Sequence, residues 1–273
     1  MAATPFLKMH GTGNDFVVLD ARKRDLNLSK EEVIRLSHRH FGIGCDQLVV
    51  LGTSKKADTF MTIYNADGSE IATCGNATRC VADFIMNESK KKEALIETKA
   101  GIRSGWRAED GNVTVNMGAP KWDWKDLPLS ESRNTLHLGL EEGLLADPVA
   151  VSMGNPHMIF FVRDLGHIKM DQWGPKLEHH PLFPERVNVS AVQLLNDHEM
   201  KMVVWERGAG LTMACGSAAC AVVVAGVRRG LCERKMTVQL PGGALNIEWK
   251  PSDEGEVLMS GAVAYVFEGE IAL

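Results

Sequence analysis

The sequence predicts an α+β fold of two similar, pseudo-two-fold related domains, each a β-rich, barrel-like sheet wrapped around one central helix. Three observations predict it. Segments of the two halves match at one constant spacing along the chain. Short apolar runs typical of strands precede the matched segments. Each half also contains one helix-like stretch that begins at a cysteine.

The repeat is clearest around two cysteines. Residues 74–79, CGNATR, resemble residues 215–220, CGSAAC, which lie 141 positions later. The same ungapped spacing relates residues 13–14 to 154–155, Gln47 to Asn188, and residues 61–65 to 202–206. Four stretches at one spacing are unlikely to coincide by chance, so the pattern indicates a duplication. Paired halves would place matching polar loops face to face across one cleft.

Strand-like runs recur in both halves. They are short, rich in β-branched and aromatic residues, and bounded by polar or glycine-containing segments. These expected strands are 16–19, 47–51, 61–64, 158–162 and 202–205. Four later strands, 236–240, 244–249, 256–259 and 262–267, follow the second helix, and residues 241–243 (PGG) mark a turn.

One helix is expected after each repeat-matched cysteine. In the first half, apolar residues recur at helical spacing; they are Ala77, Cys80, Val81, Phe84 and Ile85. In the second half, residues 218–227 are apolar on every side and are followed by Arg228, Arg229 and Gly230, which is typical of a buried helix and its C-terminus. We therefore expect a first domain over residues 1–118, a second over 119–261, and a last strand, 262–273, that completes the first domain.

Composition excludes several classes of protein. The 273 residues carry a formal net charge of −5, so the positive excess expected of a non-specific nucleic-acid binder is absent. The longest apolar run, 218–227, is about half the length of a membrane-spanning helix. The N-terminus has no basic start before an apolar core, so we expect no signal peptide and a cytoplasmic protein.

The six cysteines favour neither a disulfide framework nor a metal site. They are few and scattered for a chain of this length, so reduced thiols are expected. The spacings from Cys74 to Cys80 and from Cys215 to Cys220 are not those of zinc-binding pairs, and no histidine stands at a ligand spacing nearby. We therefore expect no metal.

Cys74 and Cys215 differ from the other cysteines because they are repeat-matched and each precedes a helix. Backbone N–H groups and the helix dipole at that position favour the thiolate, and they also suit a substrate carboxylate. One cysteine acting as a nucleophile, with His157 as its base, would leave the second thiol unexplained. Two equivalent thiols suit inversion at a carbon with an acidic proton, one thiol serving each face.

The sequence resembles the diaminopimelate epimerase family in motifs that follow the family's order over nearly the whole chain. These are residues 9–16 (MHGTGNDF), 44–47 (GCDQ), 64–68 (YNADG), 74–76 (CGN), 154–157 (GNPH), Asn188, 206–210 (ERGAG) and 214–216 (ACG). The resemblance implies a pyridoxal-phosphate-independent epimerase, with no cofactor, that interconverts LL- and meso-diaminopimelate for lysine and peptidoglycan precursor synthesis. It also implies a homodimer.

The resemblance also assigns residues. Cys74 and Cys215 match the acid/base pair, and His157 and Glu206 match residues that tune the cysteines and the substrate amine. The matches to substrate-binding positions are Asn14, Gln47, Asn65, Gly75, Asn76, Asn155, Asn188, Glu206, Arg207, Gly216 and Ser217. Arginine can hold a carboxylate through two hydrogen bonds, and glutamate can accept from an ammonium.

Two alternatives stay open. One is a relative within the fold, either a proline or hydroxyproline racemase or an isomerase without the cysteine pair. The paired cysteines argue against the isomerase, and Glu206 and Arg207 with Asn155 and Asn188 favour a substrate with a charged distal end. The other is a protein that binds an amino acid without reacting with it. Such a protein would keep its affinity when either thiol is removed.

Overall fold

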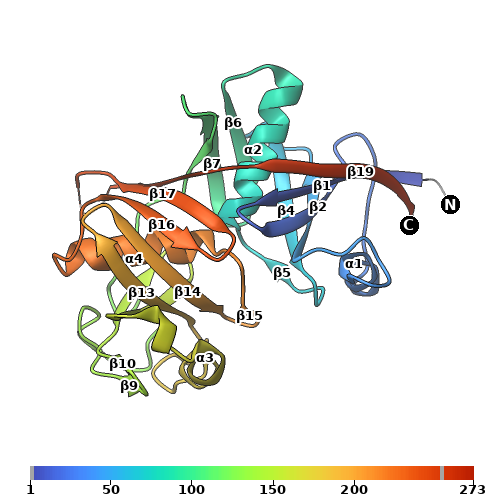
Figure 1. Ribbon diagram of the computed structural model, residues 1–273. Coiled ribbons are helices and arrows are strands. Elements are labelled where there is room, and N and C mark those ends of the chain that lie inside the picture. The colour runs from blue at the N-terminus through green and yellow to red at the C-terminus, as the bar shows by residue number, and fades with distance from the viewer. Residues whose placement is uncertain (1–2, 253–254) are drawn as a thin grey trace. The chain divides into compact units, whose positions relative to one another are not determined.

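The computed structural model describes residues 3–252 and 255–273 (Figure 1). The chain divides into two compact units. The first comprises residues up to Val115 together with Gly261–Leu273, and the second comprises Asn116–Ser260. Each is described below on its own.

Strands of the first unit form one mixed sheet. In chain order they are β1 (Ala3–Gly11), β2 (Asn14–Asp20), β3 (Gln47–Gly52), β4 (Thr59–Asn65), β5 (Glu70–Ile71), β6 (Glu93–Thr98), β7 (Gly101–Arg107), β8 (Val113–Asn116) and β19 (Ala264–Ala272). The hydrogen-bonded order is β19–β1–β2–β3–β4–β6–β7–β8, with β5 also paired to β4. Among the strand pairs just given, β2–β3 and β4–β6 are parallel and the others are antiparallel.

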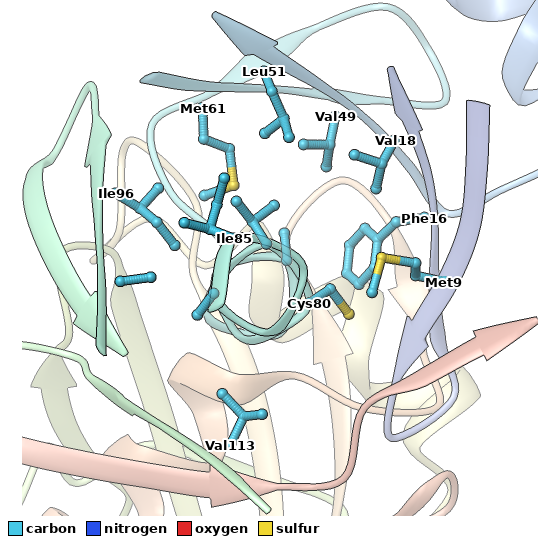
Figure 2. Packing of buried hydrophobic residues seen from close by; sticks show 14 of the residues in the cluster. Met9, Phe16, Val18, Val49, Leu51, Met61, Cys80, Ile85, Ile96 and Val113 are labelled. Atoms are coloured by element: carbon cyan, nitrogen blue, oxygen red, sulfur yellow. The ribbon is translucent and has the colours of Figure 1, made fainter. Parts of the chain in front are cut away.

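Helix α2 (Gly75–Ser89) is the central helix of the first unit, and Figure 2 shows strand side chains pointing toward it from several directions. Its core includes Met9, Phe16, Val18, Val49, Leu51, Met61, Cys80, Ile85, Ile96 and Val113, each at most 2% exposed. Fully burying a side chain of this size contributes about 1.5–3 kcal/mol. The helix ends at Lys90, whose φ of 59° is left-handed, as is common where a helix stops.

A second helix, α1 (Lys30–Ser37), connects the parallel strands β2 and β3. It begins at Ser29, whose hydroxyl accepts from the backbone N–H of Glu32, while the Glu32 carboxylate accepts from the N–H of Ser29. Its buried residues Val33 and Leu36 pack with Val17, Leu19 and Leu48. Because residues 17, 19 and 48 alternate with those that face α2, the sheet is covered on both faces.

The second unit repeats this arrangement. Its strands are β9 (Glu141–Glu142), β10 (Leu145–Ala146), β11 (Val149–Ser152), β12 (Pro156–Phe161), β13 (Asn188–Asn196), β14 (Glu199–Glu206), β15 (Gly210–Leu211), β16 (Lys235–Leu240), β17 (Gly243–Trp249) and β18 (Val257–Gly261). The main sheet runs β11–β12–β13–β14–β16–β17–β18, and β15 pairs with β14. Its parallel pairs, β12–β13 and β14–β16, occupy the places of the parallel pairs of the first unit.

Helix α4 (Gly216–Arg228) is the central helix of the second unit, and every residue from Ala218 to Gly226 is buried. Helix α3 (Met170–Glu178) connects the parallel strands β12 and β13, after a short 3₁₀ turn, η1 (Leu165–His167). Leu177 and Met170 of α3 pack against Met158, Phe160 and Val189 on the other face of the sheet.

The strand registers confirm the internal repeat. Phe16 pairs with Gln47 and Gln47 with Asn65 in the first unit; His157 pairs with Asn188, and the register of β13 and β14 sets Asn188 opposite Glu206. Adding 141 to each number of the first set gives the second. The offset extends to α1 and α3, and to the pairs Tyr64–Glu70 and Trp205–Leu211. The two units are therefore copies of one fold, as the sequence predicts.

The predicted strands are present near their expected positions, and most of them extend further along the chain than predicted. The strand expected at 262–267 is β19, which continues to Ala272 and pairs with β1. The helices α1 and α3 were not predicted, nor were the strands β1, β5, β6, β7, β8, β9, β10, β11, β13 and β15. Four of these strands, β5, β9, β10 and β15, are only two residues long. Within the described ranges, 3–252 and 255–273, no helix is long and apolar enough to cross a membrane.

Candidate active site

Cys74 and Cys215 occupy the same position, the residue immediately before the first turn of α2 and of α4. Both have extended backbone, with φ and ψ of −145° and 119° for Cys74 and −121° and 111° for Cys215. Neither side chain caps its helix, and neither first turn holds an acidic residue. The positive end of each helix dipole is thus not neutralised by a carboxylate in its own first turn.

Asn14 organises the residues around Cys74. Its Oδ1 accepts a hydrogen bond from Asn76 Nδ2 at 3.2 Å and from the thiol of Cys74 at 3.8 Å. Its Nδ2 donates to Asp46 Oδ2 at 3.0 Å, which fixes the orientation of the amide. We call Asn14, Cys74, Gly75 and Asn76 the Cys74 cluster.

Gln47 and Asn65 form a second group in the same unit. They face each other across β3 and β4, and Gln47 Nε2 donates to Asn65 Oδ1 at 3.0 Å. Asn65 Nδ2 in turn donates to Ser69 Oγ at 3.1 Å, within the turn that follows β4. Both residues are half-buried, and Gln47 Oε1 is a buried acceptor with no hydrogen-bond partner in the described part of the chain.

The Cys215 cluster, formed by Asn155, Cys215, Gly216 and Ser217, has matching contacts. Asn155, the counterpart of Asn14, donates from Nδ2 to Ser217 Oγ at 3.4 Å. Ser217, the counterpart of Asn76, lies 3.5 Å from Cys215 Sγ. In both units the asparagine at the start of the strand therefore contacts the second residue of the central helix.

His157 is fully buried behind this cluster, and its Nε2 lies 3.0 Å from Asn155 Oδ1. Burial, and then the positive charge of Arg207, lower the pKa of His157 to about 3. The ring is therefore neutral at physiological pH. Because a carbonyl oxygen only accepts, Nε2 carries the proton and donates it to Asn155, which leaves Nδ1 unprotonated. His157 thus orients Asn155 as a neutral donor.

Cys215 does not have the depressed pKa that its helix position predicts. Its side chain is almost fully enclosed, and burial followed by the negative charge of Glu206 raises the pKa of the thiol well above its usual range. Hydrogen bonds from Ser217 and from the backbone N–H of Ala218 act in the opposite direction and are outweighed. Cys215 is therefore a protonated thiol, because desolvation destabilises a thiolate here by more than the helix N-terminus stabilises it.

Glu206 is the last residue of β14, and Arg207 follows it directly. The Glu206 carboxylate accepts a hydrogen bond from the hydroxyl of Thr212, and Arg207 Nη1 donates to the carbonyl oxygen of Glu185 at 2.9 Å. Asn188 is nearly buried and bridges two backbone segments: its Nδ2 donates to the Pro156 carbonyl at 3.0 Å, and its Oδ1 accepts from Arg207 N at 3.0 Å. The structure thus places Asn188 beneath the loop that carries Arg207.

Three residues that sequence reasoning missed contact the predicted ones. Asp46 accepts a hydrogen bond from Asn14, and Thr212 donates one to Glu206. Glu178 accepts hydrogen bonds from the two residues that flank the pair 206–207, Trp205 and Gly208. Asp46 lies in a motif that resembles the family. Glu178 carries no such signal, because its role depends on tertiary packing. Among the described residues, no group of three histidine, cysteine or acidic side chains is arranged to hold a metal ion.

A duplicated α+β chain with a thiol at the start of each central helix defines a protein of the amino-acid racemase and epimerase type. Residues 6–122 and 149–266 match the family model described as diaminopimelate epimerase. The chain belongs to the diaminopimelate epimerase family.

Two relatives illustrate how close this similarity is. The chain is 50% identical to a diaminopimelate epimerase of Acidiphilium cryptum over 99% of this chain and 97% of that protein. It is 48% identical to that of Rhodospirillum centenum over 98% of this chain and 92% of that protein.

Solved structures with lower identity share the fold. A hydroxyproline epimerase from Agrobacterium vitis gives a TM-score of 0.73 at 14% identity, covering 99% of this chain and 91% of that one. A phenazine biosynthesis protein of the PhzF family from Bacillus anthracis gives 0.71 at 19% identity, covering all of both chains.

Proposed function

We propose that this protein interconverts LL-2,6-diaminopimelate and meso-2,6-diaminopimelate, in lysine and peptidoglycan precursor biosynthesis. The observation that carries the proposal is the repeated cysteine. Each copy of one fold presents a thiol immediately before an uncapped central helix, in a chain that belongs to the diaminopimelate epimerase family. In this proposal the two units are the domains of a duplicated enzyme.

The proposed chemistry is a two-base proton transfer at one α-carbon. The thiolate of one cysteine takes the α-proton, so that a C–H bond breaks and an S–H bond forms. The thiol of the other cysteine gives its proton to the opposite face, which forms the new C–H bond and leaves a thiolate. After one turnover the two cysteines have exchanged protonation states. The configuration of the reacting carbon decides which cysteine removes the proton, so the two thiols exchange roles between the forward and the reverse reaction.

Proton removal leaves negative charge on the α-carbon and its carboxylate. The proposed stabilisers are the backbone N–H groups at the two helix starts, Gly75 with Asn76 and Gly216 with Ser217. Glycine directly after each cysteine allows a carboxylate to approach these N–H groups closely. Fixed donors of this kind need no reorganisation as charge develops, so the reaction is proposed to proceed without pyridoxal phosphate or metal.

The remaining polar side chains are proposed to select the substrate. Diaminopimelate carries two ammonium and two carboxylate groups. In the proposal Arg207 binds a carboxylate and Glu206 accepts from an ammonium. The amides donate and accept without adding net charge; these are Asn14, Gln47, Asn65, Asn155 and Asn188. His157, being neutral, acts by orienting Asn155 rather than by carrying charge.

Chiral chromatography tests the proposed reaction directly. Reduced protein incubated with LL-diaminopimelate in EDTA, with no cofactor added, is expected to produce the meso isomer until both isomers are present at equilibrium. Incubation with trans-4-hydroxy-L-proline serves as the comparison substrate. Inversion of hydroxyproline without inversion of diaminopimelate would replace the proposed substrate while keeping the two-thiol reaction.

We also propose that the protein is a cytoplasmic homodimer. All six cysteines are free thiols, which suits a reducing compartment. In the first unit, β19 exposes three adjacent large side chains, Tyr265, Val266 and Phe267, each about half exposed. An exposed apolar patch on a strand at the edge of a sheet is typical of a surface that pairs with another chain.

Substitution of Val266 by arginine tests the dimer. Val266 lies at the bulge between β1 and β19, outside the regular pairing, so the change adds a charge to the patch with little cost to the fold. We expect light scattering after size exclusion to give twice the chain mass for the native protein and a larger monomer fraction for the variant. A native protein that elutes as a monomer at micromolar concentration would contradict the proposal.

A further inference from the structure

A buried carboxylate in the second unit has no part in the proposed proton transfer. Glu178 is the last residue of α3 and is 4% exposed. Acidic side chains are seldom buried unless hydrogen bonds satisfy them, because removing a carboxylate from water is costly. The hydrogen bonds that Glu178 makes therefore indicate its role in the structure.

Both oxygens of Glu178 accept hydrogen bonds from the residues that flank the pair Glu206–Arg207. Its Oε2 accepts from the indole Nε1 of Trp205 at 2.7 Å, and its Oε1 accepts from the backbone N–H of Gly208 at 2.9 Å. One carboxylate thus fixes the chain on both sides of the pair.

A nearby positive charge and tight packing around Trp205 support the hydrogen bonds of Glu178. Arg186, about half exposed, lies 3.6 Å from Oε1 and supplies a compensating positive charge. The β-carbon of a residue at Gly174, within α3, would lie 2.6 Å from the Trp205 ring, so the helix and the indole are packed tightly together. Glu178 therefore acts on a ring that has little room to move.

The first unit builds the same turn without such a carboxylate. The repeat offset places Ser37 at the position of Glu178 and Asp67 at that of Gly208. There the turn after β4 is held locally, because the Asp67 carboxylate accepts from the N–H of Ser69 at 2.8 Å. The duplicated fold therefore does not require a buried acid at this position, and Glu178 serves the loop of the second unit specifically.

We propose that Glu178 is a positioning residue that sets the direction of the Glu206 and Arg207 side chains toward the charged groups of the substrate. The inference rests on the proposed function, in which these two residues select diaminopimelate. Glu178 acts through the indole of Trp205 and the backbone N–H of Gly208, and the side chain of Asn188 accepts from Arg207 N.

Glu178→Gln tests the inference, because it replaces one carboxylate oxygen by an NH₂ group and leaves the number of heavy atoms unchanged. Glutamine offers one acceptor oxygen, so either the Trp205 indole or the Gly208 amide then faces an N–H donor. We expect KM for LL-diaminopimelate to rise about tenfold while kcat stays within about threefold, because one buried donor loses its partner. Glu131→Gln, the same change at an exposed site in the same unit, is expected to leave both parameters unchanged.

Coupling to the pair Glu206–Arg207 separates positioning from a merely structural role. If Glu178 acts through the pair 206–207, adding Glu178→Gln to the double variant Glu206→Gln/Arg207→Gln raises KM by less than about twofold beyond that double variant alone. An equal tenfold rise in both backgrounds would overturn the inference, and so would an unchanged KM in the single variant. Thermal unfolding of each variant checks that the compared proteins are folded.

Amide exchange keeps failure of this inference distinct from failure of the proposed function. In ¹H–¹⁵N spectra, the Trp205 indole N–H and the Gly208 N–H of the native protein are expected to exchange slowly, and at least about tenfold faster in Glu178→Gln. Unchanged exchange would contradict the contact itself. Native protein that shows slow exchange but does not turn over LL-diaminopimelate would contradict the proposed function and, with it, the positioning role.

Discussion

Replacing either Cys74 or Cys215 by alanine is expected to lower the rate of epimerisation by about 10²- to 10⁴-fold, the range that positioned acid or base groups contribute. Each variant lacks one of the two proton-transfer groups, so neither can complete inversion. The measurement is the rate of meso-diaminopimelate formation from the LL isomer under reducing conditions. We expect similar losses from the two substitutions, since the reaction uses each thiol once in each direction.

Cys232→Ala is the matched control. Cys232 is a half-buried thiol of the second unit, and burial followed by the charge of Glu233 raises its pKa to about 12, but it lies after α4 and outside both cysteine clusters. Its substitution should leave turnover within about twofold of native, as for most substitutions remote from the chemistry. Full turnover in either Cys74→Ala or Cys215→Ala would refute the two-base scheme.

The second large effect concerns the stability of the protein in acid. The pKa of His157 is lowered from 6.5 to about 3, because burial and then the Arg207 charge disfavour the protonated ring. In the unfolded chain the ring takes up a proton as the pH falls below 6.5, while in the folded chain it stays neutral. The stability that the neutral ring contributes is thus present above pH 6.5 and is lost as the pH falls toward 3.

The expected size follows from the shift. One pKa unit corresponds to about 1.4 kcal/mol, so His157 accounts for a loss of about 3 kcal/mol between pH 7 and 4. Phe16 occupies the equivalent position in the first unit, so His157→Phe substitutes the residue that the same fold already accommodates. Urea unfolding at several pH values should give a variant whose free energy of unfolding falls less in acid, by about 3 kcal/mol. Equal pH dependence in both proteins would show that His157 is not held neutral.

The repeat allowed much of this architecture to be predicted from the sequence. A spacing of 141 residues predicted that Asn14 corresponds to Asn155 and Cys74 to Cys215, and the strand registers and helix starts follow that spacing. The reason is physical: a duplicated chain keeps its hydrophobic pattern and its turn residues, and these fix the registers. The helix after Cys74 was likewise evident from its apolar periodicity, and the helix after Cys215 from a continuous apolar run that ends in basic residues and glycine.

Other features depend on tertiary environment and could not be predicted. The sequence places Cys215 at a helix start, which favours the thiolate, but burial and Glu206 raise its pKa instead. The sequence predicts Asn188 as a substrate-binding residue, yet its side-chain amide forms hydrogen bonds with two backbone segments. Glu178 lies in an ordinary helical segment, and only folding brings it against Trp205 and Gly208.

Isotope transfer at low conversion tests the two-thiol mechanism most directly. LL-diaminopimelate is incubated with reduced protein in deuterated water, and product and remaining substrate are separated and analysed by proton NMR and mass spectrometry. With one thiol for each face, the meso product carries deuterium at the inverted carbon while the recovered LL substrate keeps its α-proton. Deuterium appearing equally in recovered substrate and product, or product that retains the original proton, would contradict the mechanism.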